Sequence, residues 1–384
     1  MQFTTNPQML HEMLALGICY FLFAVGYTWG LYHLGKTWEP ETSDLTQSLP
    51  SSADCCILVP FRNEERNLAA LLPNLMDSLP FATKVVFIDD HSEDGGEALI
   101  RNFIQAYDIQ NWFVVPSIGL GKKAALNTGV EASHSEIILT IDADISLSKG
   151  WLKSMLAPFN KANIQLVAGP VMTHSANGIF YKFQQIEWAS LLLISNYFFK
   201  KGHPLMCSGA NLAFRTSAFE EVAGYTGNFH IHSGDDEFLL KKMNKKYGAD
   251  TLVYLNGPSV LVQTQPMTTP GDWIRQRSRW ASKWNAHGEK GHPFTAVLLA
   301  IFCLIVLSSI PLVFFSWKLT CTLIFVWSLK FIAEKAVLGK VLKLYGLKFS
   351  NKNWFLAGWI YPLMVLATLP YAILGKYIWK GRKN

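Results

Sequence analysis

Charged residues are scarce in this chain of 384 residues. They make up 16% of the sequence, whereas typical soluble domains contain about 25%. Hydrophobic residues make up 50%, and the shortage of charge is greatest near the two ends of the chain. This uneven distribution argues against a uniformly soluble protein and indicates a central domain with membrane-embedded segments at both ends.

Four apolar stretches account for the shortage of charge. A helix needs roughly 20 mostly apolar residues to cross a bilayer. Three of the stretches are long enough, and the third in chain order is shorter and contains Lys330. The first lacks a basic start and a small-residue cleavage site, so we expect an uncleaved anchor. The stretches are Met13–Leu31, Phe294–Trp317, Leu319–Ala333 and Trp354–Leu374.

Lysine and arginine are absent from the first twelve residues, and Lys36 follows the first apolar stretch. Because basic loops face the cytoplasm, this predicts an outside N-terminus and a cytoplasmic middle domain at the plasma (inner) membrane. The predicted loop Glu334–Asn353, which contains five lysines, fits the cytoplasm as well. Four crossings would place the basic tail, Lys376–Asn384, outside, which conflicts with its charge. The number of crossings stays open.

Other signals are missing. None of the six cysteines forms a Cys-x-x-Cys pair, which argues against a disulfide scaffold or a zinc site and fits a reduced compartment. The net charge of +6 lies mainly near the predicted membrane boundaries. It fits attraction to anionic lipid and ordinary topology-setting charge equally well. Because no basic stripe runs through the middle domain, we expect no nucleic-acid partner.

Strands alternate with helices in the first half of the middle domain, which predicts an α/β fold with a mainly parallel sheet. Ligands of such sheets bind at the carboxyl ends of the strands. Pro73 lies inside the first predicted helix and is expected to kink or shift it. The predicted strands are Cys55–Val59, Lys84–Ile88, Trp112–Val115 and Glu136–Ile141, and the predicted helices are Glu64–Leu79, Glu97–Tyr107 and Ala124–Ser133.

Two later segments combine aromatic, apolar and charged residues. Tyr181–Lys201 is too polar to span a membrane, and it fits either a helix at the membrane surface or a core helix of the domain. Asp272–Lys283 alternates tryptophans with arginines, a composition that is typical of segments at lipid headgroups.

Acidic residues follow two of the predicted strands. Asp142 and Asp144 come directly after Glu136–Ile141, where two carboxylates would suit Mg²⁺ or Mn²⁺ bound together with substrate phosphates. Asp89 and Asp90 follow Lys84–Ile88 and could accept hydrogen bonds from a ribose or a base. The alternative for this second pair is a turn and helix cap.

Two further clusters complete an ordered set. Asp235-Asp236-Glu237 packs like charges together, which favours a general base near neutral pH, although a solvated helix start also explains it. In Gln276-Arg277-Ser278-Arg279-Trp280, the guanidinium groups suit a diphosphate. The Trp280 ring offers a flat face for a sugar. An anchor at the membrane surface is the alternative role for this box.

The order of these motifs resembles that of family 2 glycosyltransferases over about residues 54–284. The final box resembles that of membrane synthases for hyaluronan, chitin, cellulose and glucosylceramide. The motifs are Val59-Pro60-Phe61-Arg62-Asn63-Glu64-Glu65, Asp89-Asp90-His91-Ser92-Glu93-Asp94-Gly95, Gly121-Lys122-Lys123-Ala124-Ala125-Leu126-Asn127, Asp142-Ala143-Asp144, Gly234-Asp235-Asp236-Glu237 and Gln276-Arg277-Ser278-Arg279-Trp280.

The resemblance implies a GT-A fold, a nucleotide-diphosphate sugar donor, most simply a UDP-sugar, and inversion at the anomeric carbon. It implies Mg²⁺ or Mn²⁺ at Asp144 and Asp142, and a catalytic base at Asp236 with Asp235 as second choice. The implied donor-binding residues are Pro60, Glu64, Asp90, Lys122, Asp142, Gln276 and Arg279. A looser match at residues 207–211 adds Ser208 and Gly209 to Trp280 as implied acceptor-binding residues.

About a hundred residues follow the final box, which is little for a polysaccharide channel. We therefore expect transfer to a lipid or lipid-linked acceptor. The alternatives are a processive synthase whose pore forms as a homo-oligomer, and an inactive membrane scaffold. The expected domains are an anchor (1–35), a linker (36–53), a cytoplasmic GT-A domain with surface helices (54–290) and a membrane region (291–384).

Overall fold

The computed structural model describes residues 7–39, 54–229, 233–282, 291–374, 378–379 and 382–383. The chain forms two compact units, each built from separated segments. The sheet unit comprises Glu39–Ser175, Ile194–Pro266 and Ile378–Asn384. The helical unit comprises Met1–Trp38, Ala176–Leu193 and Met267–Tyr377.

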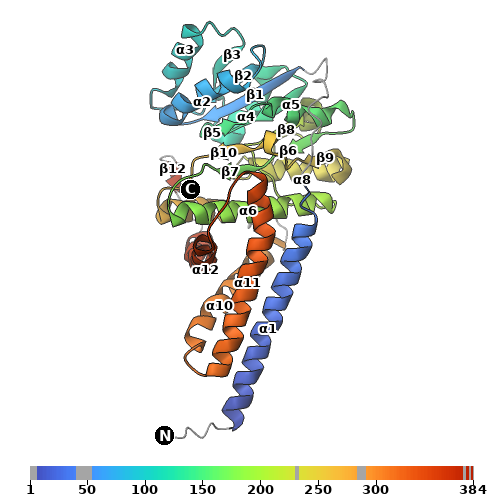
Figure 1. The fold of residues 1–384 in the computed structure, drawn as a ribbon. Helices are drawn as coiled ribbons and strands as arrows, with labels where there is room; N and C mark the ends of the chain where they lie inside the picture. Colours follow the sequence, from blue (N-terminus) through green and yellow to red (C-terminus); the bar gives the residue numbers. More distant parts are fainter. Residues whose placement is uncertain are drawn as a thin grey trace. The chain divides into compact units, whose positions relative to one another are not determined.

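A seven-stranded sheet in the order β3-β2-β1-β4-β8-β6-β9 is the centre of the sheet unit (Figure 1). All neighbouring strands are parallel except that β8 runs antiparallel to both β4 and β6. The strands are β1 (Cys55–Phe61), β2 (Lys84–Asp89), β3 (Trp112–Pro116), β4 (Ile137–Thr140), β6 (Leu166–Ala168), β8 (Leu212–Arg215) and β9 (Leu252–Tyr254). The predicted α/β class with a mostly parallel sheet is confirmed.

The first four strands form where the sequence predicts them because each is a short, continuous apolar run. Ile57, Leu58 and Val59 of β1 are completely buried, as parallel strands covered on both faces require. The connecting helices are α2 (Glu65–Ser78), α3 (Gly96–Ala106) and α4 (Lys122–Ser133). Pro73 lies inside α2, which continues to Ser78, so the proline does not end the helix.

The later strands were not predicted because they are only three or four residues long. A small second sheet has the order β5-β10-β7, from Ile145–Leu147, Val262–Thr264 and Val171–Thr173. Thr264 pairs with Ile145 on one side and Thr173 on the other. The sheet therefore fixes the chain immediately after Asp144.

The remaining helices of the sheet unit are short, apart from α8. They are α5 (Trp151–Leu156), α7 (Thr216–Glu221) and α8 (Asp235–Tyr247), with 3₁₀ turns η1 (Ala157–Asn160), η2 (Ala249–Thr251) and η3 (Pro258–Val260). The two-residue strands β11 (Ile378–Trp379) and β12 (Arg382–Lys383) pair near the end of the chain.

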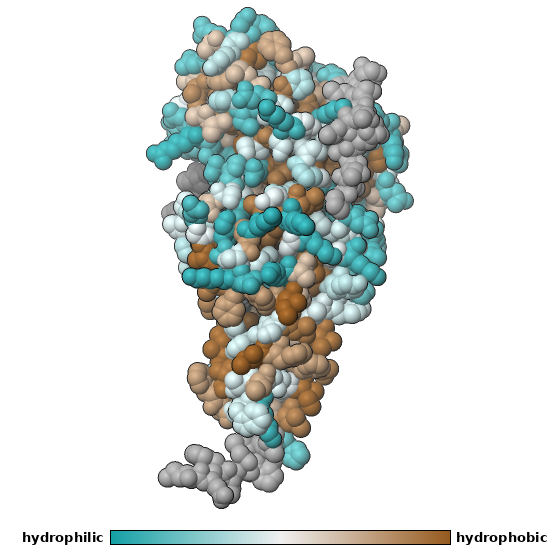
Figure 2. Space-filling view, viewed as in Figure 1, coloured by the Kyte–Doolittle hydropathy of each residue, from teal (hydrophilic) through white to brown (hydrophobic). Residues whose placement is uncertain are grey.

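Long helices make up the helical unit. They are α1 (Pro7–Lys36), α9 (Pro270–Ser282), α10 (Gly291–Leu312), α11 (Trp317–Leu344) and α12 (Asn351–Leu374), joined by the first part of α6 (Ile179–Lys200). α1 packs along α11, and α12 packs against α9 and α10. Figure 2 shows a hydrophobic surface over the long helices.

Two of these helices are long and apolar enough to cross a membrane. They are His11–Lys36 and Asn351–Tyr371, and Val297–Leu312 is a shorter apolar helix. The predicted end of the third stretch at Ala333 is wrong, since α11 continues to Leu344 and includes half of the predicted Glu334–Asn353 loop. Lys330 and Glu334 pair one helical turn apart across the predicted end, with Nζ 2.7 Å from Oε1, which is one contact that favours continuation of the helix.

α6 covers nearly all of Tyr181–Lys201, and its part up to Leu193 belongs to the helical unit, so this part is not a core helix of the sheet unit. Every residue from Ile179 to Phe199 is buried or half-buried, and Lys200 is the first exposed one. Gln184 donates a hydrogen bond to the Met267 carbonyl and accepts one from the Met267 amide, which satisfies its buried side chain.

Candidate active site

Lys122 connects two of the acidic motifs. Its Nζ lies 2.6 Å from Oδ1 of Asp142 and 3.1 Å from Oδ2 of Asp235. The lysine begins α4, Asp142 follows β4, and Asp235 begins α8. The fold therefore brings two carboxylates that are 93 positions apart in the sequence to the same ammonium group.

Burial alone would lower the pKa of Lys122 by disfavouring its charged form. The neighbouring Asp142 and Asp235, with Asp236 behind them, outweigh that effect and raise the pKa of Lys122 well above its ordinary value. The lysine is consequently a permanent positive charge in this site, suited to holding phosphate oxygens.

The first turn of α8 presents the predicted base. Gly234 precedes the helix with φ of 79°, a left-handed conformation that favours glycine. Asp235 is 9% exposed, whereas Asp236 is half-buried. Acids in the first turn also suit the positive end of the helix dipole. The three acids do begin a helix, but Asp235 and Glu237 are buried, so the interpretation as a solvated helix start is only half correct.

Gly209 joins the predicted acceptor loop to these acids. Its amide donates to Oδ2 of Asp236 at 3.1 Å, and its carbonyl accepts a hydrogen bond from the Thr140 hydroxyl at 2.8 Å. A Cβ on Gly209 would collide with Oδ2 of Asp235 and lie 3.2 Å from Nζ of Lys122. Only glycine fits this close approach.

Ser208 lies beside this glycine and is half-buried. Asn211, which was not among the predicted site residues, holds the loop of residues 207–211 in place through three side-chain hydrogen bonds. Its Oδ1 accepts from the Trp151 indole at 2.9 Å, and its Nδ2 donates to the carbonyls of Pro170 and Val260 at 2.8 Å each. The sequence offered one indication of this residue, its position at the end of the matched segment 207–211. In the structure its side-chain amide is completely buried.

Asp90 is 2% exposed, and its Oδ1 accepts a hydrogen bond from the Gly121 amide at 2.9 Å. It therefore fixes the loop that leads directly into Lys122. Asp89 has the turn role, since its Oδ1 accepts from the Ser92 amide at 2.9 Å. Arg62 donates to the Asp90 carbonyl at 2.9 Å and ties the β1–α2 loop to the same place.

Pro60 and Glu64 lie on either side of that loop. Pro60 is buried in β1, opposite Ile88 of β2, and Glu64 is half-buried at the start of α2. Glu64 Oε2 accepts a hydrogen bond from Nδ2 of the Asn67 side chain at 2.6 Å. Both residues are thus at the carboxyl end of β1, where the sequence predicts the donor.

Asp144 lies between β4 and β5, and its Oδ2 accepts a hydrogen bond from the Thr264 hydroxyl at 3.2 Å. Within the described ranges, no cluster of three or more His, Cys, Asp or Glu side chains is arranged to hold a metal. Two carboxylates fit a Mg²⁺- or Mn²⁺-type ion that takes its other ligands from phosphates and water. Asp144 and Asp142 are the pair that the sequence predicts for such an ion, and this role stays a prediction.

The predicted arginine–tryptophan box lies on α9, in the helical unit. Arg277 donates from Nε to Oε1 of Glu187 at 2.7 Å and from Nη2 to Oε2 at 2.6 Å. The Trp273 indole donates to the same carboxylate at 3.0 Å. The guanidinium carbon lies 4.0 Å from the centroid of the Trp280 ring. Glu187, another residue that sequence reasoning missed, thus binds two members of α9.

Trp280 is occupied on one face by Arg277, and its edge packs against Trp188 with ring centroids 5.8 Å apart. Gln276 and Arg279 are half-buried on the same helix. The predicted roles of these three box residues toward donor and acceptor stay predictions. The sheet unit brings together the others, namely Lys122, Asp142, Ser208, Gly209, Asp235 and Asp236, with Asp90 one hydrogen bond from the Lys122 loop.

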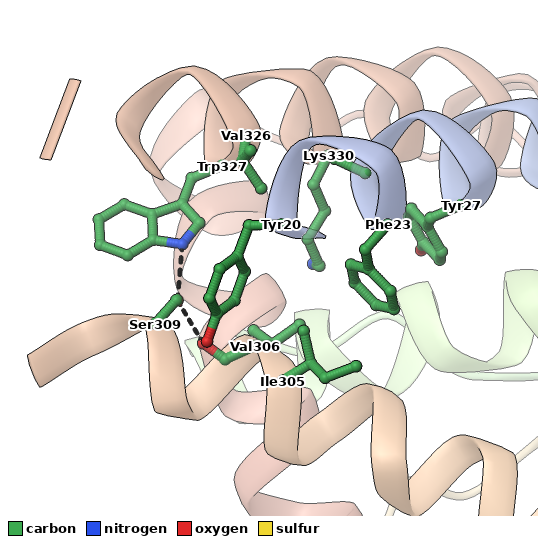
Figure 3. A pocket seen from close by; sticks show the side chains of 10 residues that line it. Tyr20, Phe23, Tyr27, Ile305, Val306, Ser309, Val326, Trp327 and Lys330 are labelled. Atoms are coloured by element: carbon green, nitrogen blue, oxygen red, sulfur yellow. Dashed lines mark hydrogen bonds between the residues drawn. The ribbon is translucent and has the colours of Figure 1, made fainter. Parts of the chain in front are cut away.

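A pocket in the helical unit lies elsewhere on the chain. Side chains of α1, α10 and α11 line it, including Tyr20, Tyr27 and Lys330 (Figure 3). The Trp327 indole donates to the Ser309 hydroxyl at 2.9 Å beside it. None of the predicted site residues contributes to this pocket.

Comparison with known families gives a match over residues 56–223, which correspond to the model described as glycosyl transferase family 2. This segment, a little under half of the chain, is similar to a family 2 glycosyltransferase domain. The match includes Asp90, Lys122, Asp142, Asp144 and Gly209, and ends before the α8 acids and the arginine–tryptophan box.

Two curated relatives are glycosyltransferases by name. The probable glycosyltransferase YdaM of Bacillus subtilis is 25% identical over 267 residues, covering 64% of this chain and 58% of the relative. The dodecaprenyl-phosphate galacturonate synthase of Rhizobium johnstonii is 25% identical over 170 residues, covering 44% and 48%. The chain thus spans about half the length of these relatives.

Among solved structures, the fold resembles that of a mannosyltransferase from Pyrobaculum calidifontis in complex with GDP-Man and Mn²⁺. The TM-score is 0.57 with 17% identity, and the alignment covers 94% of this chain and 97% of the other. This likeness concerns the fold, which is of the GT-A type, and extends over the long helices as well as the sheet.

Proposed function

We propose that this chain is an inverting glycosyltransferase that moves a sugar from a nucleotide-diphosphate donor to a lipid or lipid-linked acceptor at the cytoplasmic membrane face. The bridge formed by Lys122 between Asp142 and Asp235 is the observation that carries the proposal. It joins the donor motif after β4 to the acids of α8, so both halves of a transfer reaction share one site.

On the donor side, Pro60, Glu64 and Asp90 would surround the nucleoside at the carboxyl ends of β1 and β2. Asp90 has a second task, since its hydrogen bond to the Gly121 amide holds the turn before Lys122. The lysine would bind the diphosphate, because its charge is permanent and its amine is anchored by two carboxylates.

Asp144 and Asp142 would hold Mg²⁺ or Mn²⁺, which would supply positive charge to the departing diphosphate. The Pyrobaculum mannosyltransferase binds Mn²⁺ together with its sugar nucleotide. The hydrogen bond from Thr264 orients Asp144 for this task.

On the acceptor side, Asp236 would accept the proton of the attacking hydroxyl. The acceptor oxygen forms a bond to the anomeric carbon as the bond from that carbon to the diphosphate oxygen breaks. Attack opposite the leaving group inverts the configuration. Gly209 holds Asp236 by one carboxylate oxygen, and Ser208 would contact the acceptor. Asp235, which already binds Lys122, is the second candidate base.

Gln276, Arg279 and Trp280 would complete the site around diphosphate and acceptor. Arg277 is not available for this purpose, since its guanidinium binds Glu187 and stacks on Trp280. Arg279 is therefore the arginine of the box that we assign to the diphosphate.

A lipid acceptor is supported by the apolar helices α1 and α12 and by the dodecaprenyl-phosphate specificity in the name of the Rhizobium relative.

Full-length protein in lipid nanodiscs, incubated with radiolabelled UDP- and GDP-sugars and a lipid extract, tests the proposal. We expect label to enter the organic phase in short products with inverted anomeric configuration, and Asp236→Asn to abolish this. A ladder of long water-soluble products would instead establish the polymer synthase. Donor binding without transfer to lipid, sugar or water would establish the scaffold.

A further inference from the structure

We infer that α12, although apolar from Trp354 onward, lies along the membrane surface, and that α1, α10 and α11 are the helices that cross. The inference rests on the membrane attachment in the proposed function and goes beyond it by assigning each helix a place. It also settles the side of the C-terminus, which charge and hydropathy leave in conflict.

The helices of the helical unit run in two directions. In Figure 1, α1, α10 and α11 run lengthwise, whereas α12 is seen nearly along its axis and so runs across them. α1 packs along α11, and α10 and α11 are joined by a short turn. These three helices have 30, 22 and 28 residues, lengths of at least about 33 Å at 1.5 Å per residue. Each is therefore long enough for a hydrocarbon core of about 30 Å, although α1 is the one of the three that is also apolar over such a length, and the apolar part of α10, Val297–Leu312, is shorter.

Contacts with α9 determine the level of α12. Ala357, Ile360 and Tyr361 of α12 pack in one apolar cluster with Trp273 and Ile274 of α9. The other side of α9 is polar: the side chain of Arg275 is 64% exposed and pairs with Asp272. A helix with this polar face cannot enter the hydrocarbon, but it fits the headgroup layer. Because α12 is packed against α9, it is held at the same layer.

Charged residues of α11 lie beside α12 and indicate the same depth in the membrane, the headgroup layer. A Cβ on Gly358 of α12 would lie 3.4 Å from Nζ of Lys330 and 3.6 Å from Oε2 of Glu334. The Tyr27 hydroxyl of α1 donates to Oε1 of Glu334 at 2.7 Å. These polar groups therefore meet where α12 crosses the bundle. Charged side chains of membrane helices gather near such interfaces.

Aromatic residues mark the far end of the bundle. Phe314, Phe315 and Trp317 in the α10–α11 turn are 86%, 68% and 73% exposed. Aromatic side chains with this exposure are typical of the belt at a membrane–water boundary. The outward face of α12 exposes Phe355, Leu363 and Tyr371. With protein on its inner face, α12 would bury these three side chains among lipid chains.

Counting crossings gives the side of the tail. The sheet unit follows α1 and lies on one side of the membrane. From that side, α10 crosses to the opposite side and α11 crosses back. With α12 on the surface, the C-terminus remains on the side of the sheet unit. Lys376, Lys380, Arg382 and Lys383 then follow the rule that basic segments stay in the cytoplasm.

Three full-length variants test this arrangement, each with one epitope insertion. One epitope lies in the exposed Tyr107–Asp108 turn of the sheet unit, one between Phe315 and Ser316, and one after Asn384. Antibody binding is measured on sealed spheroplasts and on inverted vesicles, for variants that remain in the membrane fraction.

We expect the first and third epitopes to bind antibody only in inverted vesicles and the second only in spheroplasts. Opposite sides for the first and third would show that α12 crosses and would overturn the inference. The same side for the first and second would show that α10 and α11 do not cross and would also overturn it. The readout does not depend on turnover, so failure of the proposed chemistry would be seen separately in the transfer assay.

Discussion

The carboxylate of Glu187 accepts two parallel hydrogen bonds from the guanidinium of Arg277, at 2.7 and 2.6 Å. Both side chains are about nine-tenths buried. The pair connects α6 to α9. Arg277, the first arginine of the box, therefore holds α9 in place.

The first prediction concerns this pair. Glu187→Gln should destabilise the protein by about 3 kcal/mol, because it leaves the Arg277 charge buried without its partner. Arg277→Lys should also destabilise, since a lysine cannot form two parallel bonds. Thermal unfolding in detergent measures both. The double variant Glu187→Gln/Arg277→Met should lose less stability than the sum of the losses in Glu187→Gln and Arg277→Met measured separately. Strict additivity would show that the two residues do not act together.

The second prediction separates the two candidate bases. Asp236→Asn should lower kcat by about 100-fold or more while leaving the KM for the donor nearly unchanged. Asp235→Asn should instead raise the donor KM, because it removes one anchor of Lys122. Steady-state kinetics with varied donor distinguishes the two patterns. A larger loss of kcat in Asp235→Asn would reassign the base to that residue.

The third prediction concerns the metal. Asp144→Ala should weaken donor binding at least tenfold in the presence of Mg²⁺ or Mn²⁺, and removal of metal with EDTA should weaken binding to the unchanged protein similarly. Calorimetric titration of a nucleoside diphosphate measures both effects. Asp108→Ala, an exposed acid in a turn of the same unit, is the matched control. Donor affinity that is the same with and without metal would exclude this role.

The fourth prediction concerns Gly209. Gly209→Ala should lower turnover at least tenfold, because the new methyl group would displace Asp235 and crowd Lys122. Gly26→Ala is the control, since a Cβ there meets nothing within 4 Å. Transfer assays at matched protein concentrations measure the effect. If the two alanine variants were equally active, the close packing of Gly209 against Asp235 and Lys122 would not be required for turnover.

The fifth prediction is a pH dependence. The folded protein raises the pKa of Lys122 above its ordinary value of 10.5. The stability that this charge contributes is therefore fully present below about pH 10.5 and is lost only as pH rises through the folded-state pKa. Between pH 7 and 9, the difference in Tm between the unchanged protein and Lys122→Met should stay constant. A difference that shrinks steadily over this range would show that the lysine titrates there.

Sequence reasoning located the parallel half of the sheet because its strands are continuous apolar runs. Cys55–Val59 and Lys84–Ile88 were each predicted to within two residues of the observed strands. It did not find β5, β7 or β10, since three residues carry too little periodicity to be distinguished from loop. The placement of Asp144 beside Thr264 depends on those short strands and could not be predicted.

The site likewise has a part that the sequence predicted and a part that it could not predict. The motifs identified Lys122, Asp142, Asp235 and Asp236, but not the hydrogen bonds and ion pairs that join them, which depend on chain crossovers. Glu187 lies 90 residues before Arg277, in a segment without a recognisable motif. A carboxylate that acts by holding another side chain has no local pattern in the sequence.

The close packing at Gly209 limits how this active site can diversify. Ser208 is half-buried and borders the proposed acceptor, whereas its neighbour has no space for even one additional carbon. Variants with altered acceptor range should therefore arise by exchanging Ser208 or more distant residues. Libraries that randomise both positions would lose most of their active members at the glycine.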